Sequence, residues 1–204
     1  PTRSAGSPSD AAAWDPPVIG RAWGLLRDPH AAWAGIAASA DPALHITVRY
    51  VVPLSVVPAL AWIAGSFAFP DDIGGVAAAR DARAILLSGL WTFLGSLITV
   101  VLLAAAIVAI APMYGVRRDY AGAFRVAAFG LTPVWLAGAL LVKPVLLLAM
   151  LVAAMHACFL LHGGLRGVLA VREGEATEYV AVSLFLTGVA STFVGGALGF
   201  LQLI

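Results

Sequence analysis

The stretch Ala84–Ala111, AILLSGLWTFLGSLITVVLLAAAIVAIA, contains no charged residue. At 1.5 Å per residue, a helix of this length exceeds the ~30 Å hydrocarbon core of a bilayer. Trp91 lies near one end, where an indole suits the membrane interface. Four hydroxyl side chains occur in the run, and each can bond to a carbonyl of its own helix: Ser88, Thr92, Ser96 and Thr99. The stretch therefore predicts a transmembrane helix, with the other apolar runs as its neighbours in a bilayer.

The composition of the whole chain supports this interpretation. Hydrophobic residues make up 61% of the 204 residues and charged residues 11%, against about 25% charged in an ordinary soluble domain. The mean hydropathy is +0.95. The predicted fold class is an all-α, polytopic helical membrane protein. A net charge of +1 with scattered cationic residues argues against a nucleic-acid partner, and the single Cys158 excludes an intrachain disulfide.

The residues before the first span divide into two parts. Residues 1–13 are small and polar and predict a disordered tail; the chain begins without Met, so we expect a processed or trimmed end. In residues 14–45, Trp23 with Leu26 and then Trp33 with Ile36 recur at helical spacing, but the segment carries too many polar groups to span. Asp28 followed by Pro29 predicts an N-cap that separates two short amphipathic helices. These helices either lie in the membrane interface or pack against the protein's own cytoplasmic loops.

The transmembrane domain, residues 46–204, is predicted to contain five spans. Their approximate bounds are 50–69, 84–111, 124–142, 144–162 and 179–204. Pro53 and Pro58 lie inside the first span, where membrane helices tolerate proline, and we expect static kinks rather than a hinge. Lys143 and Pro144 predict a tight turn, and residues 163–178 predict a charged connection between the last two spans.

The distribution of Lys and Arg predicts how the spans are oriented. With the N-terminus in the cytoplasm, nine cationic residues lie inside: Arg3, Arg21, Arg27, Arg49, Arg117, Arg118, Arg125, Arg166 and Arg172. Three lie outside: Arg80, Arg83 and Lys143. The excess of cationic residues on cytoplasmic segments is the rule for multi-pass proteins. We therefore expect a multi-pass protein of the cell membrane with a cytoplasmic N-terminus and an external C-terminus.

The last span has a helix-packing groove formed by small residues. One row contains Thr187, Ser191, Gly195 and Gly199, and the row beside it contains Gly188, Thr192 and Gly196. Rows of small residues let another helix approach closely, so that dispersion contacts hold the pair together in lipid. Either the fold itself or a membrane-protein partner or homo-oligomer could use this groove; we give the intramolecular alternative more weight.

Few residues in the spans have side chains that could bind a metal ion, transfer a proton or take part in catalysis. His156 is the deepest ionisable group and forms a possible intramembrane polar site, although a neutral, hydrogen-bonded histidine is the more common case. Met155, Cys158 and His162 share one helix face and form a weak candidate for a Cu(I) site. No nucleophile with a base, phosphate loop or pair of intramembrane carboxylates is found. We therefore expect no enzymatic activity and no cofactor.

Several short motifs resemble the bacterial branch of the Yip1 domain family. They are the basic turn before Phe124, Thr132-Pro133, Lys143-Pro144, the run from His156 to Gly164, Tyr179, and in the N-terminal half Trp33, Asp41-Pro42, Pro53 and Pro58. The resemblance implies a five-span membrane protein. Its eukaryotic members are associated with Rab-type GTPases and vesicle traffic. This chain departs from the family at His156 and His162, where tyrosine is usual, and at Arg166, where proline is common.

Together these features favour a non-enzymatic integral membrane protein of Yip1 type. Its expected role is to organise membrane or partner proteins through helix packing and its cytoplasmic segments, with the lipid bilayer as its surroundings. The alternative is a small transporter or channel component that uses the kinked first span and His156.

Overall fold

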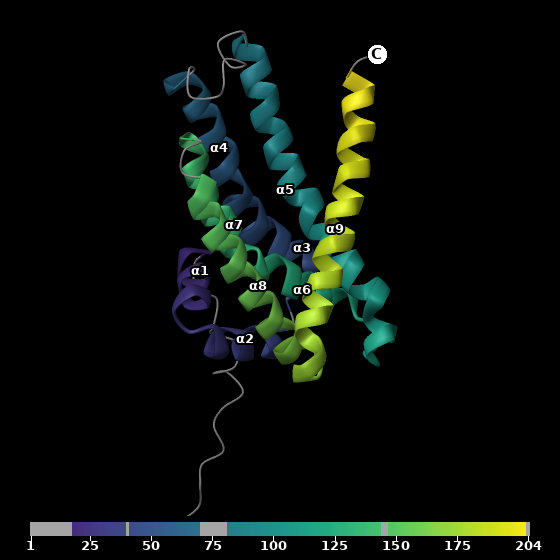
Figure 1. The fold of residues 1–204 in the computed structure, drawn as a ribbon. Helices are drawn as coiled ribbons and strands as arrows, with labels where there is room; N and C mark the ends of the chain where they lie inside the picture. The colour runs from purple at the N-terminus through teal and green to yellow at the C-terminus, as the bar shows by residue number, and fades with distance from the viewer. Residues whose placement is uncertain (1–17, 40, 70–80, 144–146, 203–204) are drawn as a thin grey trace, which may run out of the picture.

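The computed structural model describes residues 18–39, 41–69, 81–143 and 147–202, and all regular structure in these ranges is helical (Figure 1). Five helical segments are long and apolar enough to cross a membrane: Ala43–Ala68, Ala82–Tyr114, Tyr120–Val142, Ala149–Leu169 and Glu173–Gly196. The protein is thus an all-α polytopic membrane protein, as predicted. The expected N-terminal tail, residues 1–13, lies outside the described residues.

Short helices precede and interrupt the spans. In chain order the elements are α1 (Val18–Arg27), α2 (Pro29–Ala38), α3 (Ala43–Ile46), the π-helical turn η2 (Thr47–Val51), α4 (Val52–Ala68), α5 (Ala82–Ile110), the 3₁₀ turn η4 (Ala111–Tyr114), α6 (Tyr120–Gly130), α7 (Thr132–Ala137), the 3₁₀ turn η5 (Gly138–Val142), α8 (Leu147–Leu169) and α9 (Glu173–Gln202).

The two ends of the bundle differ in their short helices, their connections and their cationic residues. In Figure 1, α1 and α2 lie at the lower end together with the α5–α6 and α8–α9 connections, whereas α9 finishes at the upper end. The predicted cytoplasmic arginines of the described residues belong to the lower end. Arg83 and Lys143 belong to the upper end, at the start of α5 and just after η5. The described ends of the chain therefore lie at opposite ends of the bundle, as five spans require.

The long second span is built as the sequence predicts. Asp81 caps α5, accepting a hydrogen bond from the Ala84 amide at 2.7 Å. All four hydroxyls bond to carbonyls of the same helix: Ser88 to Ile85, Thr92 to Ser88, Ser96 to Thr92 and Thr99 to Gly95. These bonds satisfy the hydroxyls without water, which is the condition for placing them in hydrocarbon.

The first span is longer and less regular than predicted. Its helix begins at Ala43 rather than near Tyr50, and the π-helical turn η2 ends just before Pro53. Proline cannot donate a backbone hydrogen bond and its ring crowds the preceding turn, so a widened turn at this point relieves the conflict. Pro58 is buried against Gly138, where an added Cβ would lie 2.6 Å from the proline Cβ. This tight packing favours the static kink over the hinge.

The third span is broken in the middle. Helix α6 stops at Gly130, and α7 begins at Thr132 after the change of direction at Leu131. The Thr132 hydroxyl donates to the Phe129 carbonyl at 2.7 Å, so the buried Tyr50 hydroxyl, also 2.7 Å away, donates to Thr132. This chain of hydrogen bonds satisfies a carbonyl that the break leaves free and ties the third span to the first.

The predicted charged connection between the last two spans is mostly helix. Helix α8 continues through Arg166 to Leu169, and α9 already begins at Glu173. Residues 170–172 connect the two helices; Ala170 has a φ of 55°, and the turn is closed by a bond from the Val171 amide to the Leu165 carbonyl. Gly163 and Gly164 suggest a helix end in the sequence, but here they serve close packing.

The fifth span is anchored to the second near its predicted cytoplasmic end. The Tyr179 side chain is fully buried, and its hydroxyl donates to the Ile107 carbonyl in the last turn of α5 at 2.7 Å. Its ring stacks on Tyr114, with ring centroids 4.4 Å apart. Because both contacts lie close to the start of α9, they fix this end of the helix and leave its C-terminal half to be placed by weaker packing.

Candidate functional site

The second N-terminal helix is docked on the protein itself. Asp28 caps α2, accepting from the Ala31 amide at 3.1 Å, and Pro29 is the first helical residue, as predicted. Trp33 is 3% exposed and packs on the glycines of α8. An added Cβ at Gly164 would lie 2.7 Å from the indole, so only glycine leaves room for this ring. Helix α2 therefore packs on the protein itself, but on helix α8 rather than on a cytoplasmic loop.

The first N-terminal helix is amphipathic and shows its apolar side to the outside. Leu25 is fully buried, whereas Ile19 is 81% exposed and Trp23 62%. Arg21 forms an ion pair with Asp41, with 3.3 Å between Nη1 and Oδ2, which ties α1 to the segment before α3. An exposed tryptophan on an amphipathic helix is typical of the membrane interface, so interfacial placement remains our prediction for α1.

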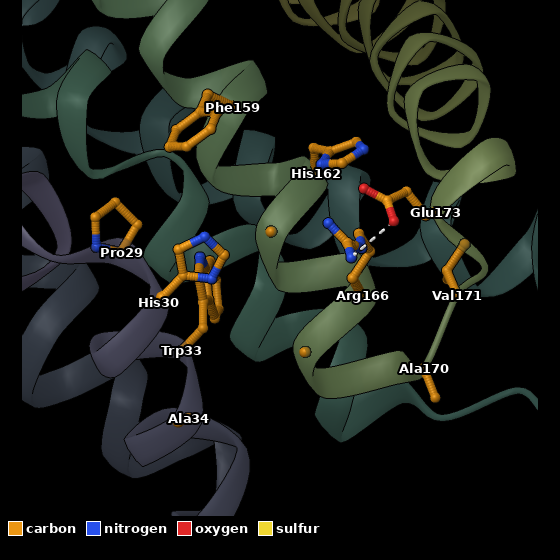
Figure 2. A pocket seen from close by; sticks show the side chains of 12 residues that line it. Pro29, His30, Trp33, Ala34, Phe159, His162, Arg166, Ala170, Val171 and Glu173 are labelled. Carbon is orange, nitrogen blue, oxygen red and sulfur yellow. Dashed lines mark ion pairs between the residues drawn. The ribbon is translucent and has the colours of Figure 1, made fainter.

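A cavity of about 780 Å³ lies between α2, the end of α8 and the start of α9 (Figure 2). We call it the α2–α8 cavity. His30 and Trp33 lie on the α2 side in Figure 2, and His162 and Arg166 lie on the α8 side. The full lining is Pro29, His30, Trp33, Ala34, Phe159, His162, Gly163, Arg166, Gly167, Ala170, Val171 and Glu173. The volume is in the range of small-molecule sites, about 300–1,000 Å³.

The polar groups of this cavity are suited to an anion. The Arg166 guanidinium pairs with Glu173, with 3.3 Å between Nη2 and Oε2, as the dashed line in Figure 2 shows. The two side chains are 38% and 76% exposed, and such exposed pairs contribute little free energy. An anionic ligand could therefore replace Glu173 as the partner of Arg166. His30 and His162 each add at least one N–H donor.

A second cavity, of about 490 Å³, lies between α8 and α9. We call it the α8–α9 cavity. Its lining is almost entirely apolar: Cys158, Phe159, His162, Thr177, Val180, Ala181 and Leu184. Phe159 and His162 line both cavities, so the polar and the apolar cavity are neighbours that share these two side chains as a wall. Because Cys158 and Leu184 lie further from the helix ends than Arg166 and Glu173, the apolar cavity is the deeper one in the membrane.

The residues predicted for intramembrane chemistry are not gathered around one point. His156 is partly buried; its Nε2 atom is buried without a hydrogen-bond partner, and its ring lies 6.0 Å from that of Phe159. Met155 is 74% exposed and lines neither cavity, whereas Cys158 and His162 line the α8–α9 cavity. Within the described ranges no three His, Cys, Asp or Glu side chains come close enough to hold a metal ion.

The predicted groove of α9 lies mostly on the outside of the bundle. Thr187 is buried and Ser191 half-buried on the side of the bundle, whereas Gly188, Thr192, Gly195 and Gly196 are exposed. An added Cβ at Gly188, Gly195 or Gly196 would meet nothing within 4 Å. Gly199 lies beyond the residues whose surroundings are described. Of the groove residues whose surroundings are described, Thr187 alone is buried against the rest of the bundle, which is the packing within the fold that we favoured. The face with Gly188, Gly195 and Gly196 is open.

The lining of the α2–α8 cavity was not predicted as a site. His30, Arg166 and Glu173 come from segments that we assigned to an interfacial helix and to a loop. A signal was present in the small residues Gly163 and Gly167, one helical turn apart on α8. That spacing marks a face that another helix approaches closely, and Trp33 contacts this face.

Comparison with known proteins gives one match. The family model described as Yip1 domain matches residues 23–195, which includes α2, the first four spans, the fifth span up to Gly195 and both cavities. No curated protein and no solved structure matches the chain.

Proposed function

Because the chain belongs to the Yip1 domain family, an integral membrane family, we propose that it organises other membrane proteins and performs no enzymatic reaction itself. The recruiting surface is the open face of α9, formed by Gly188, Thr192, Gly195 and Gly196. The partner is a transmembrane helix, either from another protein or from a second copy of this chain. The cytoplasmic segments then hold the assembled partners on one side of the membrane.

The exposed state of this face is the observation that carries the proposal. In lipid there is no hydrophobic drive between helices, so close backbone contact across small residues is the main source of association. Glycines used for packing inside this bundle show close neighbours, as at Gly65, Gly138 and Gly164. Gly188, Gly195 and Gly196 of α9 show none. A smooth face without a helix upon it is therefore available to a partner.

The test compares partners recovered from native membranes. We expect the variant Gly188→Leu with Gly195→Leu to lose a stoichiometric partner, because the leucines hold the two backbones apart. Fold should be unaffected, since neither position contacts the rest of the bundle. The measurement is affinity purification followed by mass spectrometry, with subunit mass in detergent to detect a homo-oligomer.

Ala105→Leu is the matched control, since Ala105 lies on the exposed side of α5 and the substitution adds a similar side chain. It should retain every partner. Equal recovery from the double variant and the control, or the absence of any stoichiometric partner, would overturn the proposal.

A further inference from the structure

The α2–α8 and α8–α9 cavities together have the shape and polarity of a phospholipid site. The first is lined by Arg166, His30 and His162 at the helix ends, and the second is apolar and lies deeper along α8 and α9. Phe159 and His162 line both, so a lipid whose phosphate lies in the first can place a chain in the second by passing these two side chains. We propose that one anionic phospholipid binds here, with its phosphate in the α2–α8 cavity and one acyl chain in the α8–α9 cavity.

The position of the cationic side chain determines where the phosphate of the lipid would bind. Arg166 is the only Lys or Arg among the residues that line the α2–α8 cavity, and its present partner Glu173 is 76% exposed. Arginine binds phosphate oxygens with two parallel hydrogen bonds, and the exposed pair with Glu173 that a phosphate would replace contributes little free energy. Helix α9 also begins at this cavity; the start of a helix favours negative charge, which Glu173 and Glu175 of its first turn supply in the absence of a ligand. Basic pockets between helix ends are a known mode of recognising anionic headgroups.

The depth of the α8–α9 cavity in the membrane determines where an acyl chain of the lipid would bind. Thr177 and Ala181 lie on the α9 side of the apolar cavity, and Cys158 and Phe159 on the α8 side, all within the helical segments Ala149–Leu169 and Glu173–Gly196 that can cross a membrane. A cavity so placed favours a hydrocarbon chain over water, since water there would find few polar partners. The arrangement places charge at the membrane surface and apolar space below it, as in a phospholipid. The site does not depend on the partner role proposed above.

The headgroup is tested by native mass spectrometry of the full chain in detergent, titrated with dioleoyl phosphatidylglycerol and with dioleoyl phosphatidylcholine. We expect one phosphatidylglycerol to bind selectively. Arg166→Gln should weaken it about fivefold, the usual contribution of one cation to binding an anionic lipid. Arg172→Gln is the matched control, because Arg172 pairs with Glu175 at 3.2 Å nearby but lines neither cavity, and it should change the affinity by less than about twofold. Glu173→Gln should strengthen binding, since it removes the competing carboxylate.

The acyl chain is tested by Ala181→Phe, which should fill the α8–α9 cavity and weaken phosphatidylglycerol binding, while Ala105→Phe on the exposed side of α5 should not. Equal affinity for both lipids, equal effects of Arg166→Gln and Arg172→Gln, or weaker binding in Glu173→Gln would each overturn the proposal. Displacement of the lipid by soluble glycerol phosphate at similar concentration would do so as well, since it would identify a site for soluble phosphate esters.

Discussion

Trp33→Ala is expected to release α1 and α2 from the bundle while the five spans stay folded. The indole is 3% exposed and fills the space above Gly163 and Gly164, so its removal leaves a cavity that the backbone of α8 cannot close. Such a truncation costs about 3–5 kcal/mol in a packed core. Because the loss falls on the contact between α2 and α8, it should appear as local opening rather than as unfolding of the spans.

Hydrogen exchange of the protein in detergent measures this opening. Amides of residues 18–38 should exchange at least about 100-fold faster in Trp33→Ala, which is the factor that corresponds to ~3 kcal/mol. Trp23→Ala is the matched control, because Trp23 is 62% exposed, and it should change exchange by less than about threefold. Similar exchange in both variants, or faster exchange throughout α5, would contradict the docking that we describe.

Gly65→Leu is expected to destabilise the bundle strongly, whereas Gly188→Leu is not. Gly65 lies where α4 meets the end of the third span, and an added Cβ would collide with the backbone carbonyl of Val142. A backbone cannot move away by changing rotamer as a side chain can. The loss of folding free energy should therefore exceed the ~1–3 kcal/mol of ordinary overpacking. At Gly188 the same substitution meets open space and should cost less than about 0.5 kcal/mol.

The two variants form a matched pair, because each replaces a helical glycine by leucine and so gains the same helix propensity. The measurement is the temperature at which half of the protein is lost from the monodisperse peak in detergent. A fall in this temperature for Gly188→Leu as large as that for Gly65→Leu would mean that α9 is packed against the bundle on the side that we describe as open.

Much of the fold could be predicted because the deciding signals are local. The thickness of a bilayer determines how many uncharged residues a transmembrane helix needs, and the stretch Ala84–Ala111 meets that length. It forms most of the second span. Asp28 and Pro29 need only their own neighbours to cap and start a helix, and they do so. The hydroxyls of α5 bond within a single turn, so their partners follow from helix geometry.

The remaining features depend on contacts between distant segments, which periodicity does not reveal. Gly163 and Gly164 suggest a helix end because glycine is a poor helix former, and only the presence of Trp33 shows that they serve close approach instead. The break at Leu131 is compensated by Tyr50 from another span. The site at Arg166 was missed for the same reason, since His30 and Trp33 reach it only after α2 has docked.

The five spans are predicted to cross the membrane with the end that carries α1, α2 and Arg166 in the cytoplasm, and the proposals above rest on this orientation. It is tested by single cysteines in a Cys158→Ala background, labelled in intact cells with a membrane-impermeant maleimide. The positions Ala82, Met113 and Gly174 are exposed, and replacing them leaves the charge distribution unchanged. We expect Ala82→Cys to be labelled from outside, and Met113→Cys and Gly174→Cys only after the membrane is opened. Labelling of Met113→Cys or Gly174→Cys in intact cells, with Ala82→Cys protected, would contradict the account.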